Sequence, residues 1–320
     1  MVARPLVAVL DDYQDLARAY GPWERLDGRI ELRTHTDHVA DEDALIDRLA
    51  PCEVVVAMRE RTPFPRERLA RLPKLRLLVT TGMANAAIDL EAAHELGVVV
   101  SGTAVEADST AELCWALLLA LTRHVAEEDR NMRAGGWQRT IGPELHGRTL
   151  GLAGLGRIGT RIAGYGFAFS MHVIAWSQNL DADRARTLGV EPVSKDELLR
   201  RSDVVSLHLR LSERTRGLIG AAELALMKPT AYLVNTSRGP LVEERALLAA
   251  LEAGTIAGAA LDVYDVEPLP PDHPLRRAPR TLLTPHIGYV AQSTYEGFYA
   301  QIVEDVEAWL DGEPVRVLNG

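Results

Sequence analysis

A glycine-rich turn between an apolar run and a helical stretch is the feature that most limits what this chain can fold into. The turn reads G-x-G-x-x-G at Gly154, Gly156 and Gly159, after the apolar run 149–153 and at the start of a helical pattern. In such a unit the first glycine permits a tight turn, the second lets a pyrophosphate approach the backbone, and the third packs helix against strand. The free N–H groups at the helix N-terminus favour an anion. The turn therefore predicts a dinucleotide site.

Short apolar runs and amphipathic stretches alternate on both sides of this turn. Such alternation is typical of a parallel sheet covered on both faces, and a glycine turn after the first strand fits a doubly wound dinucleotide fold. The six predicted strands are Thr149–Ala153, His172–Ala175, Val204–Leu207, Ala231–Asn235, Gly258–Leu261 and Thr281–Leu283. The helices predicted between them are Gly156–Phe169, Lys195–Arg201, Ala221–Leu226 and Glu243–Ala253.

A shorter series of the same kind comes first in the chain. Its five predicted strands are Leu6–Leu10, Ile30–Arg33, Glu53–Ala57, Leu75–Thr80 and Val98–Val100. Its predicted helices are Tyr13–Leu26, Glu42–Leu49, Arg66–Leu72 and Leu90–Leu96. Asp41 and Asp89 are the N-caps expected for two of them, because an aspartate before a helix accepts from its free N–H groups.

We therefore predict an α/β chain of two doubly wound parallel-sheet domains, for which 320 residues are sufficient. A Rossmann NAD(P)-binding domain is expected at 102–289. A smaller, flavodoxin-like substrate domain is expected to be discontinuous, with residues 1–101 and 290–320. It is discontinuous because the last predicted helix, Ser293–Trp309, crosses back onto the first series.

Composition limits the partners of the chain. The net charge is −10, so a nucleic acid is not expected to bind. No apolar run reaches the ~18 residues of a membrane span, and the N-terminus lacks a signal-peptide pattern. The only two cysteines, Cys52 and Cys114, have neither metal-ligand nor C-x-x-C spacing. We expect a cytoplasmic protein whose cysteines lie in the core and which holds no metal.

Three charged or titratable residues follow the last three strands of the second series. Arg238, Glu267 and His286 occur in that order, each beside a residue that favours a turn. A guanidinium fork suits a carboxylate, and a carboxylate beside an imidazole favours the charged ring. Singly, each residue is more often structural or solvated, but together, downstream of a phosphate loop, they favour a site at the strand ends. The set predicts reduction of a 2-keto acid: Arg238 holds the carboxylate and His286 moves the proton that accompanies hydride.

The choice of cofactor is open at this point. The second strand of a dinucleotide unit usually ends in Asp or Glu, which binds the ribose 2′-OH of NAD. Ser177 stands at that position, and the nearest basic residues are Arg184 and Arg186. Either NAD or NADP is therefore compatible with the sequence.

The motifs at the strand ends resemble those of the D-isomer-specific 2-hydroxyacid dehydrogenases. This family includes phosphoglycerate, glyoxylate/hydroxypyruvate and D-lactate dehydrogenases. The matching segments are Leu233–Gly239, Leu261–Pro268 and Thr284–Gly288. The resemblance implies an NAD(P)-dependent dehydrogenase acting on a small 2-keto or 2-hydroxy acid. It also implies a homodimer, formed through the apolar helix predicted at Ala111–Val125 and its flanks, since a helix apolar nearly all round must be covered.

The resemblance further implies roles for individual residues. Arg238 would bind the carboxylate and keto oxygen of the substrate, and Glu267 would pair with His286, the proton donor or acceptor. Asp262 looks like the residue that contacts the nicotinamide carboxamide, and Thr236 and Ser237 line the cofactor side in relatives. The predicted cofactor contacts are Gly154, Gly156, Arg157, Ile158, Gly159, Ser177, His208, Thr236 and Asp262.

On the substrate side, the segment 81–84 matches the family's substrate loop, so the amides of Met83 and Ala84 would hold the carboxylate. Arg59 and Arg61 fall where phosphoglycerate dehydrogenases keep basic residues for the far phosphate of their substrate. Glu60 lies between them and weakens that assignment. The chain ends at Gly320 without an appended domain, so a phosphoglycerate dehydrogenase of the long, regulated type is not expected.

Two other functions are compatible with this fold. A nucleotide-sensing, corepressor-like binding protein could keep all three charged residues, and turnover of NAD(P)H with 2-keto acids would distinguish it from an enzyme. A formate dehydrogenase is disfavoured, because its relatives pair the histidine with Gln where this chain has Glu267.

Overall fold

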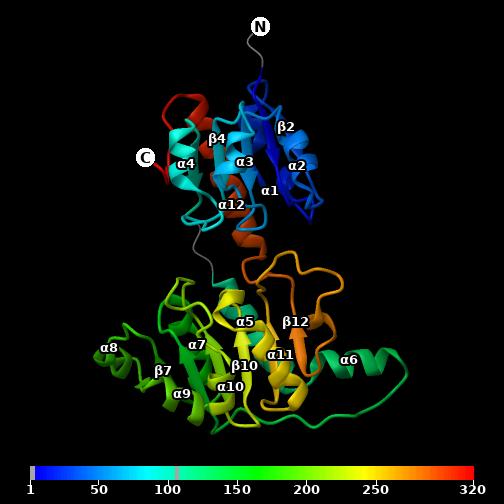
Figure 1. Ribbon diagram of the computed structural model, residues 1–320, viewed down its shortest axis with the longest axis vertical. Helices are drawn as coiled ribbons and strands as arrows, with labels where there is room; N and C mark the ends of the chain where they lie inside the picture. Colours follow the sequence, from blue (N-terminus) through cyan, green and yellow to red (C-terminus); the bar gives the residue numbers. More distant parts are fainter. Residues whose placement is uncertain (1–3, 105–107) are drawn as a thin grey trace. The chain divides into compact units, whose positions relative to one another are not determined.

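The computed structural model describes residues 4–104 and 108–320, and it divides the chain into two compact units. Unit 1 comprises Met1–Ala107 and Ala291–Gly320, and unit 2 comprises Asp108–Val290. Each unit is an α/β body built on one sheet (Figure 1). The predicted class, two α/β domains with parallel sheets, is the architecture observed.

The sheet of unit 1 has five parallel strands in the order β2-β1-β3-β4-β5. Its central strands β1 and β3 are short, rich in valine and fully buried, as expected of strands covered on both faces. The strands are β1 (Leu6–Val9), β2 (Glu31–Thr34), β3 (Val54–Ala57), β4 (Leu77–Thr80) and β5 (Val99–Gly102).

The helices of unit 1 include one from the C-terminus of the chain. Helix α12 (Gln292–Leu310) packs on β4, β5 and α1, and in Figure 1 it lies in orange and red among the blue and cyan elements. The predicted long helix Tyr13–Leu26 is instead two short pieces, α1 (Ala17–Tyr20) and η1 (Trp23–Leu26), with Gly21-Pro22 between them. The other helices are α2 (Glu42–Leu49), α3 (Arg66–Ala70) and α4 (Leu90–Glu95).

The sheet of unit 2 has seven parallel strands in the order β12-β11-β10-β9-β6-β7-β8. The chain starts at β6 in the middle, runs outward to one edge, and then returns past β6 to fill the other side. The strands are β6 (Thr149–Ala153), β7 (His172–Trp176), β8 (Glu191–Pro192), β9 (Val204–Leu207), β10 (Tyr232–Asn235), β11 (Gly258–Leu261) and β12 (Thr281–Leu283).

Helices cover both faces of this sheet. On β9, Val204 belongs to the core under α5 and α7, whereas the next residue, Val205, belongs to the core under α9, α10 and α11. The helices of unit 2 include α5 (Ser109–Thr122), α6 (Val125–Arg133), α7 (Arg157–Ala168), α9 (Lys195–Arg201), α10 (Ala221–Leu226) and α11 (Glu244–Ala253). The remaining helical elements are α8 (Ala182–Thr187), η2 (Gly239–Leu241) and η3 (Pro274–Arg277).

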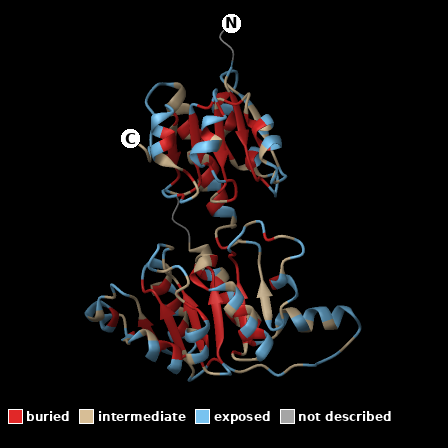
Figure 2. Ribbon diagram, viewed as in Figure 1, coloured by how far each residue is buried: buried red, intermediate tan, exposed pale blue. Residues whose placement is uncertain are grey.

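The predicted apolar helix Ala111–Val125 is wrong at its end. Helix α5 stops at Thr122, His124 adopts a left-handed φ of 54°, and a new helix begins at Val125. Helix α5 is covered largely within unit 2, where Cys114, Trp115 and Leu118 are buried. Helix α6 buries none of its residues and stands away from the sheet as a pale blue and tan helix in Figure 2.

Burial follows the two sheets, whose strands are the main red elements of Figure 2. Both cysteines are buried and free, as predicted. Among the helices of the described residues, none combines the length and the hydropathy that a membrane crossing requires.

Candidate functional site

The glycine turn after β6 has the geometry that the sequence predicts. Gly154 has a φ of 104°, and a Cβ built on it would lie 2.4 Å from the carbonyl oxygen of His208. Its N–H donates to the carbonyl of Trp176 at 2.8 Å, which ties the turn to β7. Only glycine combines this backbone with this close approach.

Gly156 and Gly159 have different roles in this turn. A Cβ on Gly159 would lie 2.2 Å from the carbonyl oxygen of Gly154, so the first turn of α7 packs directly on the glycine loop. A Cβ on Gly156 would have nothing within 4 Å, and this exposed residue caps the N-terminus of α7. The open backbone at a helix N-terminus is what a pyrophosphate needs, so these residues fit a dinucleotide.

The remaining predicted cofactor residues of the first strands lie around this turn. Ser177 is half-buried directly after β7, and His208 directly after β9. Nε2 of His208 lies 2.9 Å from Oγ of Ser206, and loss of hydration lowers the pKa of His208 to about 4. His208 is therefore a neutral ring at physiological pH. Nη1 of Arg157 lies 3.6 Å from Oδ1 of Asp108, and the Ile158 side chain packs against the core.

Arg238 lies in a turn after β10 that is held by side chains. Asn235 donates to the carbonyl of Arg238 at 2.9 Å and accepts from the N–H of Ser237 at 3.0 Å. The Ser237 hydroxyl donates to the carbonyl of Leu209 at 2.5 Å. One guanidinium nitrogen of Arg238 donates to the carbonyl of Ser237 at 2.7 Å, and the side chain is half-buried. Thr236 is buried in the same turn.

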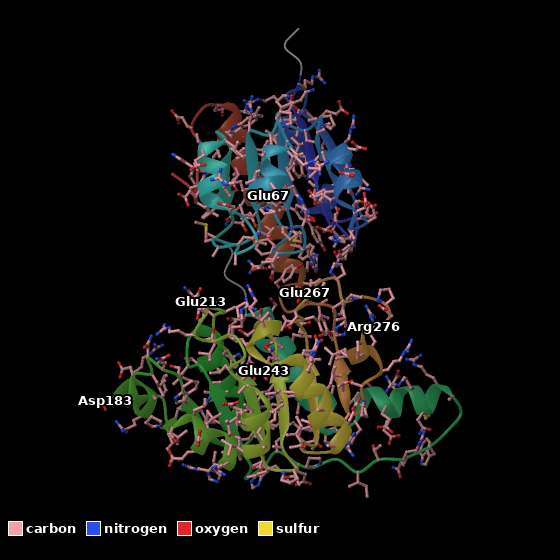
Figure 3. The ribbon with its side chains drawn as sticks, viewed as in Figure 1. Glu67, Asp183, Glu213, Glu243, Glu267 and Arg276 are labelled. Atoms are coloured by element: carbon pink, nitrogen blue, oxygen red, sulfur yellow. The ribbon has the colours of Figure 1, made fainter. Side chains whose placement is uncertain are left out.

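Glu267 and His286 meet in the loops after β11 and β12. Oε2 of Glu267 lies 2.5 Å from Nδ1 of His286, and both side chains are largely buried. The other carboxylate oxygen of Glu267 accepts from the N–H of Tyr264 at 2.9 Å. Figure 3 labels Glu267 in its loop. A carboxylate that accepts from Nδ1 fixes the ring orientation and leaves Nε2 as the atom that can exchange a proton with a ligand.

Asp262 holds the turn that carries His286. Its carboxylate is fully buried and accepts from the hydroxyl of Thr284 at 2.6 Å and from the N–H groups of Ile287 and Gly288, each at 2.8 Å. Burial raises the pKa of Asp262, and these hydrogen bonds oppose that rise. His286 has a left-handed φ of 53°, which a non-glycine residue keeps only with such support.

The three charged residues follow neighbouring strands. β10 pairs with β11, and β11 pairs with β12, all in parallel. Arg238, Glu267 and His286 therefore come from adjacent loops at one edge of the sheet of unit 2. Tyr289 extends this cluster, because its ring packs edge-on against His286 with 5.6 Å between the ring centroids. Among residues 4–104 and 108–320, no group of three His, Cys, Asp or Glu side chains is arranged to hold a metal.

The predicted substrate loop lies in unit 1, after β4. Met83 and Ala84 are exposed, and Thr81 beside them is buried. The N–H of Gly82 donates to the hydroxyl of Thr103 at 2.8 Å, which anchors the start of the loop. Arg59 and Arg61 follow β3, the neighbouring strand.

Sequence reasoning missed the residues that hold the site in place. Asn235 and Thr284 were predicted only as parts of strands or motifs, and Tyr264 was not singled out. Their signal was available, because an Asn that ends a buried strand commonly bonds to backbone two or three residues on. Tyr264, by contrast, packs in the same core as Leu247, which lies 17 residues earlier. No sequence pattern predicts a contact over that separation.

Comparison with known proteins places the chain among dehydrogenases. Residues 115–288 match the family described as "D-isomer specific 2-hydroxyacid dehydrogenase, NAD binding domain". A glyoxylate reductase of Aeropyrum pernix is 42% identical over 262 residues, which is 78% of this chain and 78% of the relative. A glyoxylate reductase of Korarchaeum cryptofilum is 38% identical over 309 residues, or 92% and 93% of the two chains.

A solved structure gives the same result. The crystal structure of a phosphoglycerate oxidoreductase from Vibrio cholerae O395 is 38% identical and superposes with a TM-score of 0.92. The alignment covers 97% of this chain and 100% of the other. The two-domain fold class predicted from the sequence is thereby confirmed.

Proposed function

The chain belongs to the family of D-isomer-specific 2-hydroxyacid dehydrogenases and is an NAD(P)-dependent enzyme of that class, and we propose that it reduces a small 2-keto acid with Arg238, Glu267 and His286. The observation that carries this proposal is the contact between Glu267 and Nδ1 of His286 at 2.5 Å. Arg238 follows β10 and Glu267 follows β11, and these two strands are paired. The guanidinium and the proton donor His286 therefore belong to the same edge of one sheet.

Proton transfer follows from the orientation of the ring. Nδ1–H of His286 donates a hydrogen bond to Glu267, so in the charged ring Nε2 carries the second proton. His286 gives that Nε2 proton to the keto oxygen as hydride reaches the carbonyl carbon, and it is left neutral with Nδ1–H still directed at Glu267. In the oxidative direction the neutral ring takes the hydroxyl proton back. A positioned acid of this kind contributes about 10²–10⁴-fold to the rate.

Arg238 orients the substrate. Its guanidinium presents several N–H donors in one plane, which match a carboxylate and the neighbouring keto oxygen. The bond from Arg238 to the carbonyl of Ser237 and the side-chain bonds of Asn235 limit the positions that this fork can take. From unit 1, we propose that the N–H groups of Met83 and Ala84 also bind the substrate, with Arg59 acting on the same loop.

Unit 2 is proposed as the cofactor-binding unit and unit 1 as the substrate unit. The bound nicotinamide cofactor supplies the hydride. Gly156 and the N-terminus of α7 would hold its pyrophosphate, because the backbone there is open and the first N–H groups of the helix are oriented toward an anion. Ser177 brings no charge to the ribose position, so we propose that the enzyme accepts NADP as well as NAD.

A corepressor-like binding protein is not favoured, because the relatives at 38–42% identity are named as reductases. Glu267 beside the histidine also argues against the formate dehydrogenase alternative. A panel of 2-keto acids with NADH and NADPH tests the proposal directly. We expect oxidation of the reduced cofactor with glyoxylate or hydroxypyruvate, and binding of cofactor without turnover of any keto acid would overturn it.

A homodimer is proposed from the apolar side chains that unit 2 exposes. Val125, Met132, Trp137 and Ile141 on α6 and the following segment are 54–97% exposed. Clustered exposed apolar side chains are typical of protein interfaces. The sequence suggested the helix Ala111–Val125 and its flanks, and the proposal now rests on the C-terminal flank of α5. Sedimentation of the wild type as a dimer, and of a Trp137→Ser, Ile141→Ser variant as a monomer, would support it; a monomeric wild type at micromolar concentration would contradict it.

A further inference from the structure

Two arginines, Arg59 and Arg61, follow β3 in unit 1. We propose that the enzyme acts on short 2-keto acids that carry a single negative charge, because Arg59 and Arg61 are built into the unit. Arg59 is a positioning residue that braces the substrate loop. This inference rests on the proposed function and adds the class of substrate to it.

The backbone of Arg59 is fixed by the loop after β4. Its N–H donates to the hydroxyl of Thr81 at 2.9 Å, and its carbonyl accepts from the Asn85 side chain at 2.8 Å. Arg59 has a left-handed φ of 53°, which is unfavourable for a residue with a side chain and persists only where surrounding contacts determine it. The residue is therefore locked to both ends of the segment 81–85.

The guanidinium of Arg59 lies against the same segment. Its Nη1 donates to the carbonyl of Thr81 at 2.9 Å. A Cβ built on Gly82 would lie 2.0 Å from this Nη1, so the guanidinium occupies the space that a side chain on Gly82 would need. The loop that presents Met83 and Ala84 thus rests on Arg59. The same contacts commit the guanidinium to the backbone and restrict its reach toward a distant part of a ligand.

Arg61 is committed to a different neighbour. It is only 6% exposed, and its guanidinium carbon lies 4.8 Å from the ring centroid of Tyr13. The Tyr13 hydroxyl donates to Asp11 at 3.3 Å, and burial together with the Asp11 carboxylate raises the pKa of Tyr13. Asp11 is itself buried and also accepts from Thr62 at 2.7 Å. Its burial and its contact with Tyr13 restrict the reach of Arg61 toward a ligand.

Nearby carboxylates also weaken the attraction of these arginines for a second anion. Oε2 of Glu60 lies 3.7 Å from Nε of Arg59, and Asp11 accepts from the hydroxyl of Tyr13, the ring that Arg61 contacts. Each cation is therefore accompanied by a carboxylate. These carboxylates offset part of the positive charge of the two arginines and so weaken the attraction of the arginines for a phosphate.

Steady-state kinetics of three keto acids test the substrate class. We expect kcat/KM for glyoxylate and hydroxypyruvate to exceed that for 3-phosphohydroxypyruvate by about 100-fold or more, because both arginines are engaged within unit 1 and would not bind the second anionic group. Equal or higher efficiency with the phosphorylated acid would overturn the inference and leave the proposed function intact.

Binding in the presence of NADH separates this inference from the proposed function. We expect oxamate, a short mono-anion, to bind more tightly than phosphonopyruvate by isothermal titration. The opposite order would overturn the inference even if no keto acid were turned over, whereas absence of turnover alone would count only against the proposed function.

The variant Arg59→Gln tests the bracing role. A brace acts on every substrate, so KM should rise about 10-fold or more for glyoxylate and hydroxypyruvate alike, with a smaller change in kcat. If Arg59 instead bound a far phosphate, the loss would be confined to 3-phosphohydroxypyruvate, and that result would overturn the inference. Arg59→Lys, which keeps the charge, should restore only part of the loss. Arg66→Gln, an exposed arginine of the same unit, is the matched control.

Discussion

The carboxylate of Asp262 accepts the backbone N–H of Gly288 at 2.8 Å and thereby fixes the end of the turn that carries His286. Its other oxygen accepts from the N–H of Ile287 and from Thr284. The position of His286, the acid that we propose for catalysis, therefore depends on the buried carboxylate of Asp262. These hydrogen bonds hold the backbone of the turn and do not involve the imidazole ring. The nicotinamide contact that the family resemblance implies for Asp262 stays a prediction beside this positioning role.

Asp262→Asn should impair catalysis without removing the catalytic histidine. An amide has one acceptor oxygen, so at least one of the N–H groups of Ile287 and Gly288 would face an NH₂ group. We expect kcat to fall by about 10–100-fold, since a shift of ~1 Å in a catalytic group can cost 10²-fold. Asp265→Asn, an exposed residue of the same segment, is the control. Wild-type kcat in Asp262→Asn would mean that the turn does not need its carboxylate.

Arg238→Lys should be a severe substitution although it keeps the charge. An ammonium group cannot donate two parallel hydrogen bonds as the guanidinium fork does. We expect kcat/KM to fall by about 10²-fold, as for the loss of other orienting contacts. Steady-state kinetics with the best keto acid provide the measurement, with Arg214→Lys, an exposed arginine of unit 2, beside it. Full activity in Arg238→Lys would exclude bidentate binding.

Ser177→Asp should change the preference between cofactors. A carboxylate after β7 can accept from the ribose hydroxyls of NAD and repels the 2′-phosphate of NADP. We expect the ratio of kcat/KM for NADH to that for NADPH to rise about tenfold or more, which corresponds to ~1.4 kcal/mol. Ser177→Ala is the control, because it removes the hydroxyl without adding charge. A wild type that already rejects NADPH strongly would show that another residue sets the preference.

Asp305 on α12 should make unit 1 less stable as the pH rises. This carboxylate is fully buried beside Arg316, and burial raises its pKa to about 7. The unfolded chain releases this proton near its ordinary value of about 4, so between about pH 4 and pH 7 the folded state holds a proton that the unfolded state does not. Stability present at low pH is therefore lost across that window.

The variant Asp305→Asn should remove this loss. We compare the melting temperature of the variant with that of the wild type at each pH. The difference should be more favourable to the variant at pH 8 than at pH 5, by about 2–4 °C for each kcal/mol of stability that the wild type loses. Differential scanning calorimetry at the two pH values measures the effect. Glu304→Gln is the control, because this half-exposed carboxylate contacts the same arginine. An identical difference at both pH values would show that Asp305 does not titrate in this window.

The parts of the site that sequence reasoning could predict are those fixed by local rules. Gly154 has a φ near 100° and lies close to a carbonyl, so no other residue fits there. Such a requirement is visible in the sequence as a glycine at a fixed place in the turn. The placement of Arg238, Glu267 and His286 after adjacent strands was equally accessible. The carboxyl ends of parallel strands lie at one edge of a sheet, and apolar runs mark those strands.

The parts that could not be predicted depend on contacts between distant residues. The role of Arg59 comes from Thr81, 22 residues away, and that of Asp262 from Gly288, 26 residues away. No periodicity reports such pairs. The end of α5 was missed because the chain breaks at His124, which adopts a left-handed φ without the glycine that usually marks a helix end. Strand β8 has two residues, one of them a proline, and is too short to give an alternating pattern.

The central claim is that His286, held by Glu267, donates the proton to the keto oxygen. Single-turnover oxidation of bound NADH by the best keto acid, in the wild type and in His286→Ala, tests it most directly. We predict that the hydride-transfer rate of His286→Ala falls by about 10²–10⁴-fold while the dissociation constant of NADH stays within about twofold. A hydride-transfer rate close to that of the wild type, with the cofactor bound normally, would contradict the claim.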